Sequence, residues 1–76
     1  MNTTSPEQQA NARMALAESL TDTSRSLDRA RRRIEATIMA LENLHDPDAT
    51  SSHIQNCRQA IVLLEQTNNT VRKMMT

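Results

Sequence analysis

One short segment divides the sequence: Leu44-His45-Asp46-Pro47-Asp48. Pro47 disfavours helix at the residue before it and cannot donate the next backbone hydrogen bond, so a helix arriving from the N-terminal side should end here. The only other proline is Pro6, and the chain contains no glycine. The sequence therefore predicts two helices joined by a single turn.

The first helix has a recognisable start. Ser5 can cap it, Pro6 suits its first position, and Gln8 stands where a capping box requires Glu or Gln. No helix breaker follows before the central segment, and frequent alanines raise the intrinsic helix propensity. We expect this helix over residues 6–45.

The turn is expected over residues 46–51 and the second helix over residues 52–74. Ser52-His53-Ile54-Gln55 offers a second capping box, although a cap at Asp46 or Thr50 would start the helix earlier. Helices joined by a short connection pack as antiparallel neighbours. The chain should therefore fold as one all-α domain, a coiled-coil-like antiparallel two-helix hairpin with a long first helix and a shorter second helix.

Both helices carry apolar residues at heptad spacing, which places every seventh residue on one side. In the second helix this stripe consists of Ile54, Cys57, Ile61, Leu64, Asn68, Val71 and Met75. In the first helix it consists of Leu20, Leu27, Ile34 and Leu41, with Leu16, Thr23, Ala30, Thr37 and Leu44 expected in the second row. The two stripes predict an intramolecular seam that leaves residues 6–19 without a neighbour.

Asn68 would place an amide within this seam. A buried amide costs stability, but it fixes the register of two helices when it finds one specific acceptor. Close to the end of a fraying helix, the same amide could instead be half solvated. The sequence leaves both interpretations of Asn68 open.

The chain is short of core material. It has 76 residues and no Phe, Trp or Tyr, and below roughly 70–80 residues a lone core rarely supplies more than about 3–5 kcal/mol. Cys57 is the single cysteine, so no intramolecular disulfide can add stability. We therefore expect a second protein chain to be the missing stabiliser.

Several apolar side chains fall outside the predicted seam. They are Met14, Leu16, Ile38, Met39, Val62 and Leu63. A self-sufficient hairpin would carry polar residues at the flanking positions, so we interpret these six as a partner-binding surface, with methionines supplying adaptable contacts. A wider core stripe, or scattered surface hydrophobes, is the alternative interpretation.

Arginines concentrate at the centre of the first helix, at positions 25, 29, 31, 32 and 33. Asp28 and Glu35 stand at i,i+4 spacing from Arg32 and Arg31, which favours ion pairs along the helix. The formal net charge is +0, and no aromatic is present for base stacking. This pattern favours a solvated, salt-bridged face over a nucleic-acid site.

No pattern indicates catalysis, a metal or a cofactor. His45, Asp46, Asp48 and His53 gather near the turn but match no metal-ligand spacing, and no glycine-rich phosphate loop exists. No apolar stretch approaches the ~20 residues needed to cross a bilayer, and none follows Met1 as a secretory signal would. We expect a cytoplasmic, non-enzymatic protein with no membrane contact.

Three short stretches resemble the small E-type co-chaperones of bacterial type III secretion systems: Leu44-His45-Asp46-Pro47, Ala60-Ile61 and Leu63-Leu64-Glu65. Members of that family pair with a larger tetratricopeptide-like chaperone, and the heterodimer keeps the needle subunit monomeric in the cytoplasm. The resemblance implies a docking surface for that chaperone on both helices. The present chain departs from the family in having no aromatic residue on its second helix.

A rival hypothesis belongs to another functional class. Two hairpins would form a homodimeric four-helix bundle whose Arg25–Arg33 face contacts RNA or DNA phosphates, as in small plasmid-type RNA-binding hairpins. A third possibility is homo-oligomerisation with no other partner. The sequence alone does not choose between a homo-oligomer and a hetero-oligomer.

Overall fold

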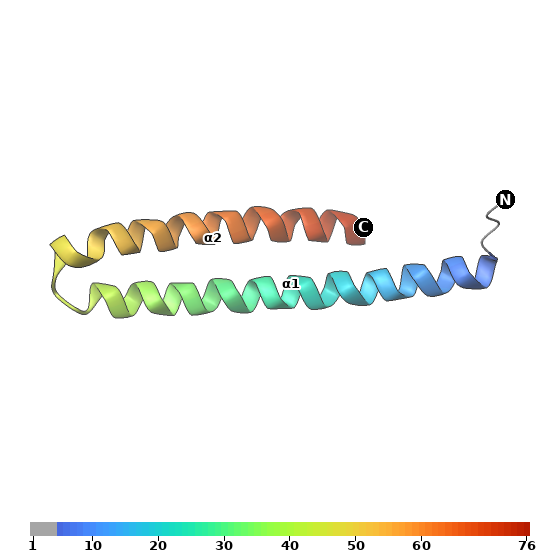
Figure 1. Cartoon of the computed structure of the whole chain (residues 1–76), viewed down its shortest axis with the longest axis horizontal. Coiled ribbons are helices and arrows are strands. Elements are labelled where there is room, and N and C mark those ends of the chain that lie inside the picture. The colour runs from blue at the N-terminus through green and yellow to red at the C-terminus, as the bar shows by residue number, and fades with distance from the viewer. Residues whose placement is uncertain (1–4) are drawn as a thin grey trace.

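The computed structural model of the chain is an antiparallel pair of α-helices (Figure 1). It describes residues 5–76, apart from the side chains of Pro47 and Ala49. Helix α1 runs over Pro6–Glu42 and helix α2 over Pro47–Met75. At 1.5 Å per residue these helices are about 56 Å and about 44 Å long, so the N-terminal part of α1 extends beyond the end of α2. The all-α hairpin with a longer first helix is the fold that the sequence predicts.

Helix α1 begins with the expected capping box. The Gln8 backbone N–H donates to Ser5 Oγ at 3.2 Å, and the Ser5 backbone N–H donates to Gln8 Oε1 at 3.4 Å. Pro6 occupies the first helical position, where its missing N–H leaves no hydrogen bond unmade. These contacts satisfy donors that every helix N-terminus otherwise leaves unpaired.

Helix α1 ends at Glu42, three residues before the predicted boundary at residue 45. The Asn43 N–H donates to the Met39 carbonyl and the Leu44 N–H to the Leu41 carbonyl, both at 3.2 Å. His45 then adopts a positive φ of 55°, in the left-handed region that ends a helix. A left-handed residue, rather than the following proline, therefore closes α1.

Helix α2 begins at Pro47, which corrects the predicted turn over 46–51 and start at residue 52. The Asp46 carbonyl accepts the Thr50 N–H at 3.0 Å and the Thr50 hydroxyl at 2.8 Å. Asp46 thus occupies the capping position that the sequence left open, and Pro47 starts the second helix as well as interrupting the first. The capping box expected at residues 52–55 is not used, because those residues already lie inside α2.

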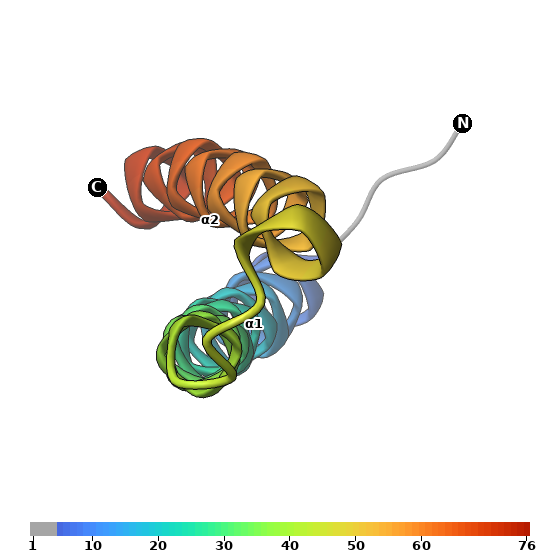
Figure 2. The same cartoon turned by 90° about the vertical axis from the view of Figure 1, so that its left-hand side faces the viewer.

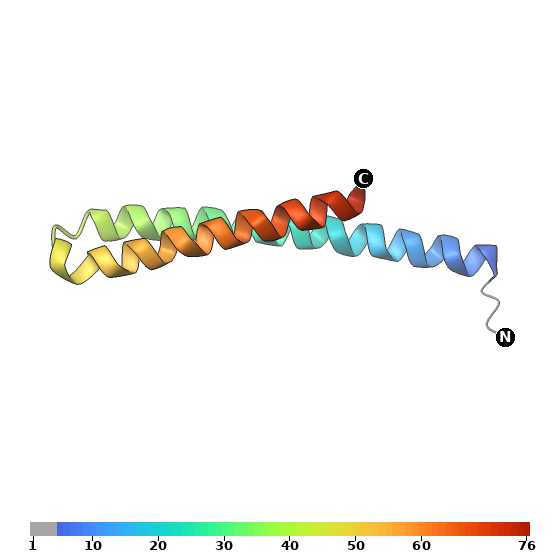
Figure 3. The same ribbon diagram turned by 90° about the horizontal axis from the view of Figure 1, so that it is seen from above.

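The heptad stripe of α2 packs against the first row of the α1 stripe, which consists of Leu20, Leu27, Ile34 and Leu41. All ten predicted seam residues are at least partly buried: Leu20, Leu27, Ile34, Leu41, Ile54, Cys57, Ile61, Leu64, Asn68 and Val71. Figures 2 and 3 show α2 crossing α1 at a small angle, so the helices stay in contact along the length of α2. Met75, at the end of the stripe, is exposed.

The second row of α1 differs from the prediction. Ser24, Arg31 and Ile38 face α2, whereas Leu16, Thr23, Thr37 and Leu44 are exposed and Ala30 is half-buried. The residues that face α2 lie four positions after Leu20, Leu27 and Ile34, whereas the predicted ones lie three positions after them. Ile38 is therefore buried in place of Thr37, and its larger aliphatic side chain buries more apolar area. Ile38 is 8% exposed, so its predicted place on a partner-binding surface is wrong.

Candidate protein-binding surface

Helix α2 presents an outer face without charge along its central turns. Over residues 51–71 the only Asp, Glu, Lys or Arg residues are Arg58 and Glu65, which lie seven apart and so share one row beside the seam. Arg58 forms an ion pair with Glu42 of α1, with 3.6 Å between Arg58 Nη2 and Glu42 Oε1. The remaining exposed residues opposite the seam define the α2 outer face: Gln55, Asn56, Gln59, Val62, Leu63, Gln66, Asn69 and Thr70.

Two aliphatic side chains lie at the centre of the α2 outer face. Val62 and Leu63 are 51% and 62% exposed. Together with Gln59 and Gln66 they line a shallow depression of about 390 Å³. A solvent-facing helix surface normally carries charged residues, and interface centres are depleted of them, so this face has the composition of a contact surface.

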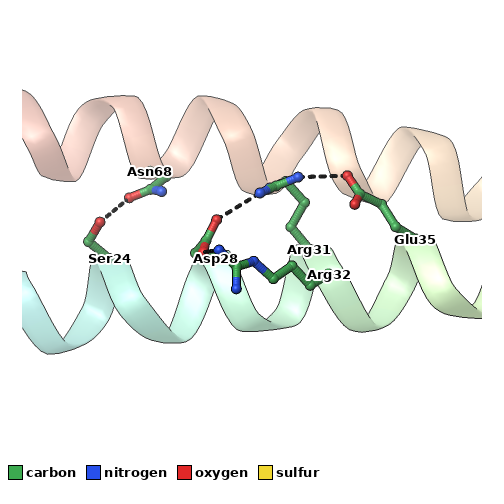
Figure 4. Close-up of polar contacts among 6 residues, drawn as sticks. All are labelled: Ser24, Asp28, Arg31, Arg32, Glu35 and Asn68. Atoms are coloured by element: carbon green, nitrogen blue, oxygen red, sulfur yellow. Dashed lines mark hydrogen bonds and ion pairs between the residues drawn. The ribbon is translucent and has the colours of Figure 1, made fainter.

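The centre of α1 is charged instead. Arg31 donates to Asp28 Oδ1 at 2.8 Å and to Glu35 Oε1 at 2.7 Å, and Arg32 lies 3.1 Å from Asp28 Oδ2. Figure 4 shows the Arg31 side chain reaching toward α2 between the two carboxylates. The hydrogen bond from Arg31 lowers the pKa of the Asp28 carboxyl, and the same bond raises the pKa of Arg31.

Asn68 has a specific partner across the seam. The Ser24 hydroxyl donates to Asn68 Oδ1 at 2.7 Å (Figure 4). Both side chains are partly buried. Among the described residues this is the one hydrogen bond between side-chain oxygen or nitrogen atoms of α1 and α2. The contact favours a role in register over a freely solvated amide.

A second apolar area lies where α2 ends beside α1. Leu16, Leu20, Met74 and Met75 take part in lining a depression of about 440 Å³ there. Thr21 Oγ1 lies 3.8 Å from Met75 Sδ, which holds the end of α2 against α1. Beyond this point the residues of α1 from Pro6 to Ser19 are all exposed.

The structure separates the predicted partner-binding residues. Val62 and Leu63 lie together on α2 and Met39 on the outer side of α1. Met14 lies on the unpaired part of α1, and Leu16 lies at the edge of that part, where it lines a depression together with Met74 and Met75. These residues therefore do not form a single patch. The sequence reasoning missed Gln59 and Gln66, although the absence of charge from one helix face was a signal that could have identified them.

The described residues contain no group of three or more His, Cys, Asp or Glu side chains that could hold a metal ion. Cys57 is half-buried between the helices. In the part of the chain that the structure describes, no helix is both long and apolar enough to traverse a bilayer.

No family model, curated protein or solved structure matches this chain.

Proposed function

We propose that this chain is a non-enzymatic co-chaperone of the cytoplasm. It docks through the α2 outer face on a larger, tetratricopeptide-like chaperone, and the complex keeps a type III secretion needle subunit monomeric. The observation that carries the docking step is the exposure of Val62 and Leu63 within a charge-free helix face. The class of partner comes from the resemblance at residues 44–47, 60–61 and 63–65.

The thin core supports dependence on a partner. Among the described residues only Leu20, Ile38 and Val71 are buried apolar residues, and none of their side chains is fully buried. Covering an exposed valine or leucine completely contributes about 1.5–3 kcal/mol, which is a large fraction of the stability that a core of this size supplies. A partner on the α2 outer face would therefore stabilise the folded hairpin substantially.

The uncharged composition makes such docking inexpensive. Burying an ion pair requires removing water from two charges, and that penalty can exceed the attraction between them. The side-chain amides of Gln59 and Gln66 can instead donate to and accept from polar groups of a partner helix. The α2 outer face thus combines an aliphatic centre with a hydrogen-bonding rim, as protein interfaces do.

Leu63→Glu tests this docking surface, with Met39→Glu as the matched control. The two side chains are similarly exposed, at 62% and 65%, but belong to different helices. The tagged chain and both variants are purified from the native host, and bound proteins are identified by mass. We expect a helical-repeat chaperone and a needle subunit with the wild type and Met39→Glu, and at least a tenfold loss with Leu63→Glu.

The docking proposal fails if Leu63→Glu retains its partner as well as Met39→Glu does. The co-chaperone proposal fails if no helical-repeat chaperone accompanies the wild-type chain. Circular dichroism of each variant shows whether the hairpin remains folded, so that a lost complex is not mistaken for lost structure.

One observation favours nucleic-acid binding as a second candidate function. Arg25, Arg29 and Arg33 are exposed and form no ion pair with any described residue. Three phosphate contacts predict that log affinity falls with log salt at a slope of about −2.7. A gel-shift titration of the wild type and the triple alanine variant measures this slope, and the co-chaperone proposal predicts no shifted band for either protein.

A further inference from the structure

We propose that the α2 outer face is also a self-association surface. The α2 helix of a second copy packs on it in antiparallel orientation, about a two-fold axis that passes between Val62 and Leu63. This inference does not depend on which partner protein the chain binds. Where both interactions exist they use one face, so the homodimer and the complex with a chaperone exclude each other.

The chemistry of the α2 outer face is largely symmetric about its centre. Of its four pairs of residues equally distant from the midpoint between Val62 and Leu63, three are alike, namely Val62 with Leu63, Gln59 with Gln66 and Asn56 with Asn69, and the fourth pairs Gln55 with Thr70. A two-fold axis at this midpoint places each residue opposite its counterpart in the other copy. Aliphatic side chains then meet aliphatic side chains, and amides meet amides.

Side-chain amides are self-complementary groups. Each Gln or Asn offers two N–H donors and one carbonyl acceptor, so two amides can satisfy one another. In the antiparallel arrangement Gln59 of each copy faces Gln66 of the other, which gives two such pairs, one on each side of the aliphatic centre. A surface evolved only for a chemically different partner has no need of this symmetry.

The charge distribution selects α2 rather than α1 as the self-association helix. The outer side of α1 carries exposed Arg25, Arg29, Arg32 and Arg33, and two copies packed through this segment would bring like charges together. Between residues 51 and 71 the α2 outer face contains no charged residue, and the exposed Asp48 and Lys73 continue this side of the helix only at its two ends. Two copies packed through α2 form a four-helix assembly whose charged α1 helices remain in water.

Two double variants with equal numbers of substitutions test the geometry. Gln59→Glu/Gln66→Glu places glutamate opposite glutamate at both pairs, whereas Gln59→Lys/Gln66→Glu places lysine opposite glutamate at both. Within one helix these positions lie about 10 Å apart, so each variant changes the monomer little. Arg29→Glu/Ala36→Glu, also seven residues apart but on exposed positions of α1, is the control.

Sedimentation velocity of each full-length protein across a concentration series gives its oligomeric state. We expect the wild type and the α1 control to dimerise, Gln59→Glu/Gln66→Glu to dimerise at least tenfold more weakly, and Gln59→Lys/Gln66→Glu to regain the dimer in a salt-sensitive form. Circular dichroism reports the fold of every variant.

The proposal is overturned by a wild type that stays monomeric at the highest concentration tested. It is overturned equally by two double variants that behave alike, or by Gln59→Lys/Gln66→Glu remaining monomeric, since a parallel pair would set like charges opposite each other. None of these results bears on the Leu63→Glu purification, because that experiment measures binding of a different protein.

Discussion

At the scale of single residues, His45 carries the conformational demand of the turn. Its φ of 55° is the one positive value among the described residues, and the chain has no glycine to take that position. The left-handed conformation costs roughly 1–2 kcal/mol for a residue with a Cβ atom. Glycine removes this penalty but loses about 0.5–1 kcal/mol of chain entropy.

His45→Gly should therefore raise the free energy of unfolding by about 0.5–1 kcal/mol. His53→Gly is the matched control, because His53 is exposed inside α2, where glycine should lower stability by a few tenths of a kcal/mol. Urea denaturation followed by circular dichroism measures both changes. Equal destabilisation by the two substitutions would contradict the assignment of a strained His45.

Ser24 and Asn68 form a contact whose worth can be measured as a coupling energy. A double-mutant cycle with Ser24→Ala and Asn68→Ala should give about 0.5–1.5 kcal/mol of coupling, the usual contribution of one hydrogen bond. Asn69→Ala in place of Asn68→Ala supplies the control, since Asn69 is exposed on the α2 outer face. A coupling of zero for Ser24 with Asn68 would mean that the contact does not fix the register.

At the scale of the helices, the Asp28 carboxylate links stability to pH. The hydrogen bond from Arg31, aided by the charges of Arg32 and Arg31, lowers its pKa from the ordinary 3.8. A lowered folded-state pKa adds stability that is fully present above the unfolded value and is lost as the pH falls through the folded value. The loss should therefore begin near pH 4 and continue below it.

The free energy of unfolding should thus drop more between pH 6 and pH 3 for the wild type than for Asp28→Asn, which removes the titrating group. Asp22→Asn, an exposed acidic residue of α1 outside the ion pairs, should keep the wild-type profile. Thermal or urea unfolding across this pH range provides the measurement. Parallel profiles for the wild type and Asp28→Asn would show that the ion pair does not stabilise the hairpin.

Helix positions were predictable only where one local rule acted alone. The capping box at Ser5 and Gln8 and the leucine row of α1 follow directly from residue type and spacing. The second row of α1 was not predictable from spacing, because rows three and four residues after Leu20, Leu27 and Ile34 both repeat every seven residues. The larger Ile38 is buried and Thr37 is exposed, so the row four residues on is the one that faces α2. Pro47 predicts the end of the first helix, but proline is equally suited to a helix start, which is why the sequence leaves a cap at Asp46 open as an alternative.

The candidate surface was predictable in part for a similar reason. Apolar residues outside a stripe can be found in a sequence, and Val62 and Leu63 are indeed exposed. Ile38 also lies outside the predicted stripe, but it is buried, because its position relative to α2 depends on how the two helices pack. The amides around Val62 and Leu63 carry no hydrophobic signal, so their place beside these two residues is found only when the whole helix face is considered.

At the scale of the whole molecule, the rod of 63 × 18 × 18 Å contains two regions of different stability. Residues 20–42 of α1 pack on α2, whereas Pro6–Ser19 are exposed throughout. An isolated helix shorter than about 12–15 residues is marginal in water, so this N-terminal part should depend on its continuity with the packed part of α1.

Hydrogen exchange of the full chain should therefore show a gradient along α1. Amides before Leu20 should exchange through local fraying at least tenfold faster than those of residues 27–41, which should open only when the hairpin unfolds. The packed segment serves as the internal control, because it belongs to the same helix. Equal protection of residues 6–19 and 27–41 would contradict this expectation, and would mean that the N-terminal part of α1 is covered in solution by a second chain.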